Sequence, residues 1–145
     1  MSTNSKSYQV SQAIANGPDM LMRTHHLSGN ATNGSITTTG LQILAAKANT
    51  YYLIVAAALT NSHSANITFT IKNTTATTPT AGTDLFIPLI HLDKGTVYDL
   101  QFNPDGWYST GINKPLQLQC DVDAVGAYAF VIREVFVATK HPDIL

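Results

Sequence analysis

The stretch ANITFTIKN, residues 65–73, decides the fold. Its apolar residues Ile67, Phe69 and Ile71 alternate strictly with threonines. Successive side chains of a β-strand point to opposite faces, so this alternation is typical of a strand with one buried and one exposed face. We therefore expect a strand here, with the two isoleucines and the phenylalanine in a core.

Similar strand signals recur along most of the chain and are separated by turn signals rich in Gly, Pro, Asn and Asp. No alternation of strands with helical patterns is present, so a parallel sheet is not indicated. The pattern predicts an all-β chain, an antiparallel β-sandwich that is jelly-roll-like and forms a single domain. The further expected strands are residues 22–29, 41–46, 51–60, 84–92, 96–102, 115–122 and 127–138.

One segment allows a second interpretation. Residues 41–59, LQILAAKANTYYLIVAAAL, contain many alanines, which favour a helix, but also Tyr, Ile and Val, which favour a strand. We favour two strands joined by a turn at KANT, residues 47–50.

The connections are predicted from their turn chemistry. DKG, residues 93–95, reads as a hairpin turn, and NPDG, residues 103–106, as a tight turn in which Gly106 takes a positive φ. Pro88 interrupts its strand, which favours an edge or bulged strand because proline cannot donate to a ladder. The Thr-rich residues 74–84 are expected to form an exposed loop.

Composition restricts the possible partners. The chain has 145 residues, of which 44% are hydrophobic and only 12% are charged, and its net charge is −1. An average domain has about twice that charged share, roughly 25%. We expect no nucleic acid and no membrane as partner, since both call for a basic surface. An uncharged surface is typical of a protein that lies against other protein, although a Thr- and Asn-rich β-domain without a partner has the same composition.

The N-terminal residues 1–17 lack the basic start and apolar core of a secretory signal, so we expect no secretory routing. We interpret residues 1–17 as a flexible polar arm and residues 18–145 as the β-sandwich domain. The longest apolar run, Tyr51–Leu59, is about half the length of the roughly 20 residues that a membrane helix needs.

No pattern indicates catalysis, a cofactor or a metal. His25 and His26 are neighbours and would point to opposite faces of a strand, so they cannot hold one metal together. Cys120 is the only cysteine and alternates with polar residues, which predicts a buried, unreactive thiol. Asp121 and Asp123 are expected on a solvated face. We therefore expect neither an enzyme nor a binder of a small-molecule substrate.

Trp107, the only tryptophan, follows the NPDG turn and is adjacent to Tyr108. Two interpretations remain open. The two rings form a loop platform on which a sugar stacks, or Trp107 is a core plug at a corner of the sandwich, with its indole N–H bonded to a backbone carbonyl.

Residues 91–135, HLDKGTVYDLQFNPDGWYSTGINKPLQLQCDVDAVGAYAFVIREV, carry a resemblance. The segment resembles the C-terminal half of small virion proteins of tailed bacteriophages, among them capsid decoration (cement) proteins. It covers about a third of the chain, and the N-terminal half has no such counterpart. The matching positions are Gly106, Trp107, Tyr108, Asn113, Leu116, Leu118, Val125, Gly126 and Val131.

The resemblance implies a decoration protein that binds the outside of the major capsid protein shell and bridges its subunits. It also implies a homotrimer that folds in the host cytoplasm and resides on the virion, without cofactors. We expect the arm to contact the shell through Tyr8, Val10 and Ile14. The alternative is a carbohydrate- or receptor-binding module of a phage tail or fibre.

Overall fold

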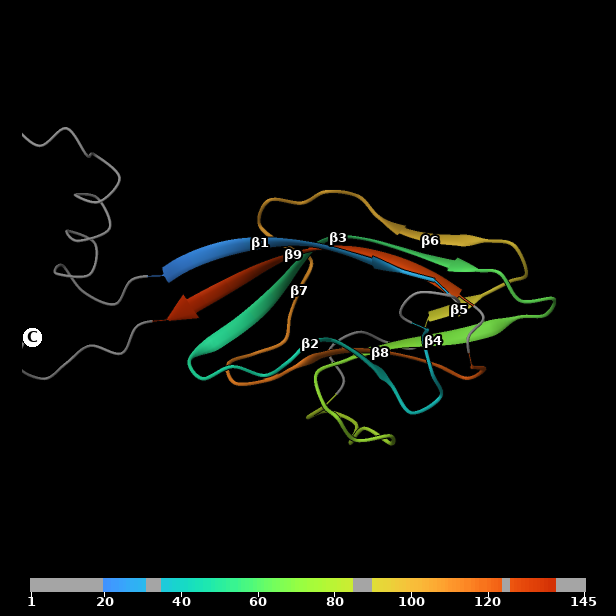
Figure 1. Ribbon diagram of the computed structural model, residues 1–145, viewed down its shortest axis with the longest axis horizontal. Coiled ribbons are helices and arrows are strands. Elements are labelled where there is room, and N and C mark those ends of the chain that lie inside the picture. Colours follow the sequence, from blue (N-terminus) through green and yellow to red (C-terminus); the bar gives the residue numbers. More distant parts are fainter. Residues whose placement is uncertain (1–19, 31–34, 85–89, 124–125, 138–145) are drawn as a thin grey trace, which may run out of the picture.

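The computed structural model describes residues 20–30, 35–84, 90–123 and 126–137. Within these ranges there is no helix, and all nine strands belong to two antiparallel sheets that pack face to face (Figure 1). The chain is therefore an antiparallel β-sandwich, as the alternation of residues 65–73 predicts.

Each sheet combines strands from both halves of the sequence. Sheet A has the order β1-β9-β3-β6, and β7 pairs with β3 beside β6; sheet B has the order β2-β8-β4-β5. Sheet A consists of β1 (Met20–Gly29), β3 (Thr50–Asn61), β6 (Val97–Leu100), β7 (Tyr108–Ser109) and β9 (Gly126–Val137). Sheet B consists of β2 (Leu41–Leu44), β4 (Ile67–Lys72), β5 (Ile90–Leu92) and β8 (Leu116–Cys120).

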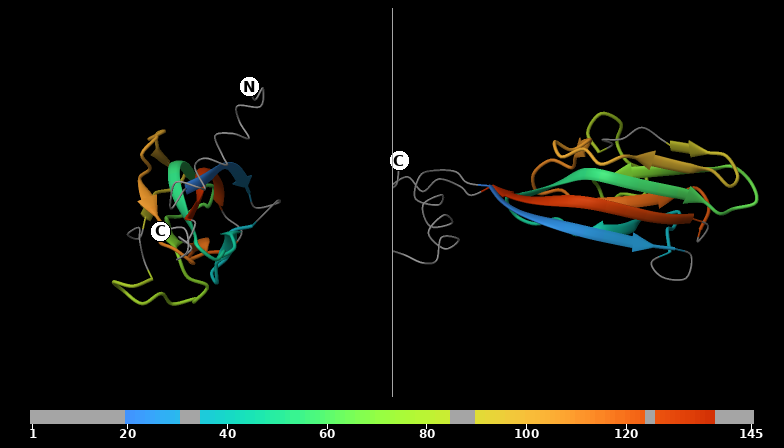
Figure 2. Two further views of the ribbon diagram at one scale, coloured as in Figure 1. Left: turned by 90° about the vertical axis from the view of Figure 1, so that its left-hand side faces the viewer. Right: turned by 90° about the horizontal axis from the view of Figure 1, so that it is seen from above.

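The pairing is nested from the ends of the chain inward. β1 pairs with β9, β2 with β8, β3 with β6 and β7, and β4 with β5, all antiparallel. The chain thus forms one long ribbon that doubles back between β4 and β5. The ribbon then folds over, so that β9 also pairs with β3 and β8 with β4. This strand order is that of a jelly roll, and Figure 2 shows the first and last strands side by side.

The segment 41–59 forms strands, as favoured above. A turn separates β2 from β3, and in it Asn49 has a left-handed φ of 55°. The side chain of Asn113 fixes this turn because its Oδ1 accepts a hydrogen bond of 2.7 Å from the Asn49 N–H. β3 then pairs with β9 from Thr50 to Asn61. These long-range backbone bonds outweigh the helix propensity of its alanines.

The prediction of a hairpin at DKG, residues 93–95, is wrong. The turn itself forms, with the Thr96 N–H donating to the Asp93 carbonyl at 3.1 Å. However, β5 lies at the edge of sheet B and β6 lies in sheet A, so the turn carries the chain from one sheet to the other. The Gly95 N–H bonds to the Asn61 carbonyl at 3.2 Å, which anchors the crossing to the end of β3. β5 is an edge strand, as predicted from Pro88, which itself lies outside the described residues.

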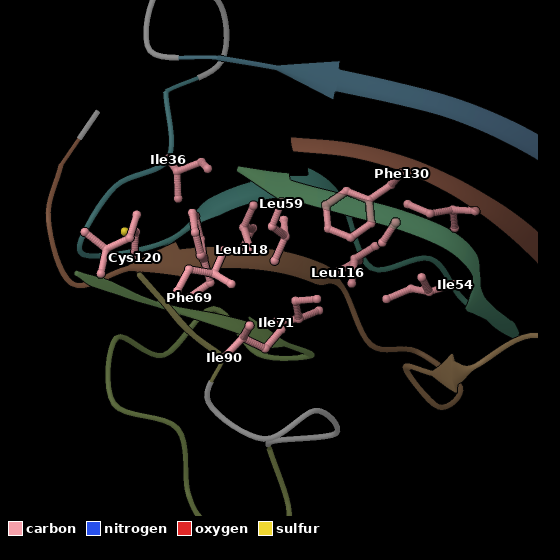
Figure 3. Packing of buried hydrophobic residues seen from close by; sticks show 14 of the residues in the cluster. Ile36, Ile54, Leu59, Phe69, Ile71, Ile90, Leu116, Leu118, Cys120 and Phe130 are labelled. Carbon is pink, nitrogen blue, oxygen red and sulfur yellow. The ribbon is translucent and has the colours of Figure 1, made fainter. Parts of the chain in front are cut away.

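The core lies between the two sheets (Figure 3). Ile67, Phe69 and Ile71 of β4 are fully buried, as their alternation predicts. Opposite them, Ile54 and Phe130 are buried from sheet A. The further buried members of this cluster are Ile36, Tyr52, Ala57, Leu59, Ile90, Leu92, Leu116, Leu118, Cys120 and Ile132.

The NPDG turn is present and depends on Gly106. Its N–H donates to the Asn103 carbonyl at 2.9 Å, and its φ is 80°. A Cβ at Gly106 would lie 2.3–2.6 Å from the side-chain carbons of Leu53. Glycine is therefore required both for the backbone conformation and for the close approach of β3.

We predict that Gly106→Ala lowers the free energy of unfolding by roughly 2–4 kcal/mol, since left-handed strain and the clash with Leu53 add. Gly111→Ala is the matched control, because Gly111 has a φ of 82° but its nearest Cβ contact would be 4.0 Å away. It should lose only about 1 kcal/mol. Urea unfolding followed by circular dichroism measures both, and equal losses would contradict the role of the Leu53 contact.

Candidate functional site

The outer face of sheet A is unusually apolar. Residues that pair directly across an antiparallel ladder share a face. Ile54 pairs with Ile132 and Ala57 with Phe130, and these pairs point into the core. The intervening pairs point outward, and most of them are apolar. The outward residues of β3 and β9 are Tyr51, Leu53, Ala56, Ala58 and Thr60, and Ala127, Ala129, Val131, Arg133 and Val135, of which Val135 is buried although it points outward.

The outer face of sheet B is different. Its outward residues include Gln42 of β2, Thr68 and Thr70 of β4, and Gln117 and Gln119 of β8. This is the ordinary pattern of an antiparallel sheet, with one apolar and one polar face. The two central strands of sheet A, in contrast, are mostly apolar on both faces, whereas the outward residues of the flanking β1 and β6 include His26, Ser28 and Asp99.

The residues after β4 cover part of the outer face of sheet B. Lys72 is fully buried there, and its Nζ donates to the carbonyl oxygens of Thr39 at 3.2 Å and Ala76 at 2.6 Å, and to Gln119 Oε1 at 2.6 Å. All three acceptors are neutral, and burial lowers the pKa of Lys72. The ammonium group thus ties the Thr-rich loop, residues 74–84, to the sheet.

A shallow groove of about 510 Å³ runs along the outer face of sheet A. Its floor consists of small side chains, Ala56 and Ala58 of β3 and Ala129 and Val131 of β9. The walls stand on β1 and β6, which are three strand spacings apart, or roughly 14 Å. The groove exists because alanine occupies outward positions where a larger residue would fill the space.

The two walls of the groove carry different groups. His26 and Ser28 line it from β1, and Asp99 lines it from β6. Phe102 follows β6 and is 65% exposed, so it projects from the wall as a large apolar side chain.

Three hydrogen bonds hold residues 101–107 beside β3 and β9, and a fourth closes this loop on itself. The N–H groups of Asn103 and Trp107 donate to the carbonyls of Val55 and Ile54, both at 2.8 Å. Arg133 of β9 donates to the Pro104 carbonyl at 2.6 Å. The indole N–H of Trp107 donates to the Gln101 carbonyl at 2.6 Å. The position of Phe102 at the groove is therefore fixed on both sides.

Trp107 and Tyr108 occupy different environments. Trp107 is 46% exposed and does not belong to the side chains packed against the core, and its indole N–H donates to the Gln101 carbonyl. Tyr108 is partly buried and packs against the core. The two rings are thus not equally accessible to a ligand. Tyr8, Val10 and Ile14, the expected shell contacts, lie outside the described residues.

Three titratable side chains, His25, Lys47 and Glu134, form one structural contact. His25 points inward and its Nε2 lies 2.9 Å from Glu134 Oε1, whereas His26 pairs with outward-facing Val131 and is exposed. Burial alone raises the pKa of Glu134, but hydrogen bonds from His25 and Lys47 and their charges outweigh it, so this pKa lies below its usual value. These contacts tie β1 and the connection before β3 to β9.

Other predicted groups are placed as follows. Cys120 is buried, and burial raises the pKa of its thiol. Asp121 and Asp123 are exposed and accept hydrogen bonds from the N–H groups of Thr68 and Thr38. Within the described ranges, no three His, Cys, Asp or Glu side chains gather as metal ligands would. The same ranges contain no helix with the length and apolarity needed to cross a membrane.

No sequence motif marks the groove residues, but the lack of apolar–polar alternation in their strands does. β4 and β8, ITFTIK and LQLQC, alternate apolar and polar residues. β3 and β9, TYYLIVAAALTN and GAYAFVIREVFV, are almost continuously apolar. Continuous apolar strands are typical of sheets that are covered on both faces.

Comparison with protein-family models gives no match, and a search of curated proteins gives none. Among solved structures, the chain is similar to one described as "Bacillus endospore appendages form a novel family of disulfide-linked pili". The TM-score is 0.44 and the identity 9%, over 85% of this chain and 92% of that chain. So weak a likeness supports no conclusion about function.

We predict that the buried Lys72 makes stability depend on pH. Because its pKa is lowered in the folded chain, the unfolded chain binds more protons between that pKa and 10.5, and the free energy of unfolding should rise with pH in this window. Lys72→Met should remove this rise with pH, and it should also lower the free energy of unfolding because three acceptors lose their donor. Exposed Lys114→Met is the control and should keep the rise.

Urea unfolding at pH 7 to 10.5 measures the free energy of unfolding of all three chains. An equal rise with pH in wild type and Lys72→Met would contradict the prediction.

Proposed function

We propose that this chain is a structural protein of a tailed-phage virion, a decoration protein that binds the outside of the capsid shell and stabilises it. One observation carries the proposal. The outer face of sheet A is apolar along both central strands and forms an open groove with the exposed Phe102 at its wall. Contiguous exposed apolar surface of this kind marks contacts with other protein.

Burial of this face provides the binding energy that the function needs. Removing apolar surface from water yields roughly 25 cal/mol per Å². A stable protein contact buries about 800 Å² on each partner. Phe102, Val97 and Met22 are large, exposed and apolar on this face, and each adds area to such a contact. A protein that works by contact alone requires no reactive side chains.

The resemblance of residues 91–135 adds the identity of the partners. In this proposal the chain forms a homotrimer that assembles in the host cytoplasm and attaches to the major capsid protein. Residues 1–17 contact the shell, with Tyr8, Val10 and Ile14 as apolar anchors. The ordering of such an arm costs entropy, which its contacts with neighbouring shell subunits offset.

A carbohydrate-binding module of a tail or fibre is the second candidate. The half-exposed indole of Trp107 favours it, because an aromatic face at a loop suits a sugar ring. The two candidates make different predictions for Trp107→Ala. In the carbohydrate-binding module this variant keeps its fold but no longer binds any sugar in a glycan screen. In the decoration protein the same variant still binds capsid shells.

We predict that deletion of residues 1–17 leaves a folded oligomer that no longer binds capsid shells. The triple variant Tyr8→Ala, Val10→Ala, Ile14→Ala should lose binding to the same degree, since it removes the apolar anchors. The matched control Gln9→Ala, Gln12→Ala changes polar positions of the same arm and should bind as wild type. Co-sedimentation with shells of the major capsid protein measures all three.

Full shell binding by the deletion variant would contradict the role of the arm. Failure of the wild-type chain to bind any shell, together with glycan binding that Trp107→Ala removes, would replace the proposed function with the second candidate.

A further inference from the structure

We propose that the outer face of sheet A is covered by another copy of this chain, with Phe102 of one copy inserted into the alanine-floored groove of its neighbour. This inference rests on the proposed function only in taking the face as a protein contact. It goes further by naming the partner and the residues that meet.

The shape of the face supports a neighbouring copy. Phe102 is 65% exposed at one wall of the groove, and the floor beside it holds Ala56, Ala58 and Ala129. The groove volume of about 510 Å³ is large enough to admit an aromatic side chain. A projecting ring and a cavity that accepts it thus occur on the same surface. Such a surface is complementary to a second copy of itself.

The charges support the same partner. Asp99 lines the wall on β6, and His26 lines the wall on β1. When the β6 wall of one copy meets the β1 wall of the next, Asp99 faces His26 of the neighbour. The imidazole of His26 and the carboxylate of Asp99 then form a polar contact at the rim of an otherwise largely apolar contact.

The two walls suit a ring of copies. The projecting ring and the carboxylate stand on the β6 side and the histidine stands on the β1 side, so each copy can turn its β6 wall to one neighbour and its β1 wall to the other, which is a heterologous contact. Such a contact closes into a ring when the rotation between copies allows it. The homotrimer of the proposed function is a ring of this kind, with the outer faces of sheet A turned towards its axis.

The test is a cycle of variants at Phe102 and Ala129. Phe102→Ala removes the inserted ring, and Ala129→Phe fills the groove from its floor. Both positions are exposed, so each chain should fold. Each single variant should weaken assembly by about 30-fold or more in dissociation constant, the usual loss at a central aromatic contact. The double variant should regain most of this loss, because the ring introduced on the groove floor then occupies the space that the ring of Phe102 leaves.

Light scattering over a dilution series measures the mass of each variant. Wild type should give about three times 15.6 kDa, near 47 kDa, and the single variants should dissociate at concentrations where wild type does not. Ile112→Ala is the matched control, since Ile112 is 49% exposed but does not line the groove. It should assemble as wild type.

Two results would overturn the inference and they differ from each other. A wild-type chain that is monomeric at all concentrations excludes a neighbouring copy on this face. Single variants that keep the wild-type mass but lose binding to capsid shells assign the groove to the shell, which contradicts this inference and leaves the proposed function in place.

Discussion

The antiparallel pairing of β3 with β9 is the constraint on which the rest of the structure depends. It joins Thr50–Asn61 to the last described strand of the chain over their full lengths, and it places both strands in the centre of sheet A. The one irregularity in this ladder lies between Ile54 and Ala56. There the carbonyl of the extra residue, Val55, accepts the N–H of Asn103. The position of the loop that carries Phe102 and Trp107 thus follows from the central ladder.

Local sequence patterns predict the described strands except the short β7, Tyr108–Ser109, because alternation and turn chemistry act over a few residues. The buried face of β4, the positive φ of Gly106 and the buried thiol of Cys120 all follow from neighbouring residues. The assignment of strands to sheets does not. At residues 93–96 the chain reverses as the glycine predicts, but β4 and β3 are already available as partners in different sheets. Turn chemistry fixes a reversal of direction and not the strand that pairs next.

The groove was harder to predict for the same reason. Its floor combines Ala56 and Ala58 with Ala129 and Val131, which are far apart in the sequence and meet only through the register of β3 and β9. A single tryptophan after a turn can be recognised in the sequence as a candidate site. A row of outward alanines from two distant strands forms no motif that can be recognised in this way. The lack of alternation in both strands is the signal, and it identifies the sheet with two apolar faces but not the cavity within it.

The two outer faces of the sandwich differ in how far the chain itself covers them. Sheet B is covered in part by its own Thr-rich loop, to which the buried Lys72 bonds, so that face is completed within the chain. Of the described residues, those at 103–107 cover one end of the outer face of sheet A, at Leu53 and Arg133, whereas the alanine-floored groove beside them is open. An open apolar sheet surface promotes aggregation unless a specific partner meets it. With so few charges on this face, most of that specificity must come from shape, and the contact between Asp99 and His26 at the rim of the groove adds only a small part that depends on salt.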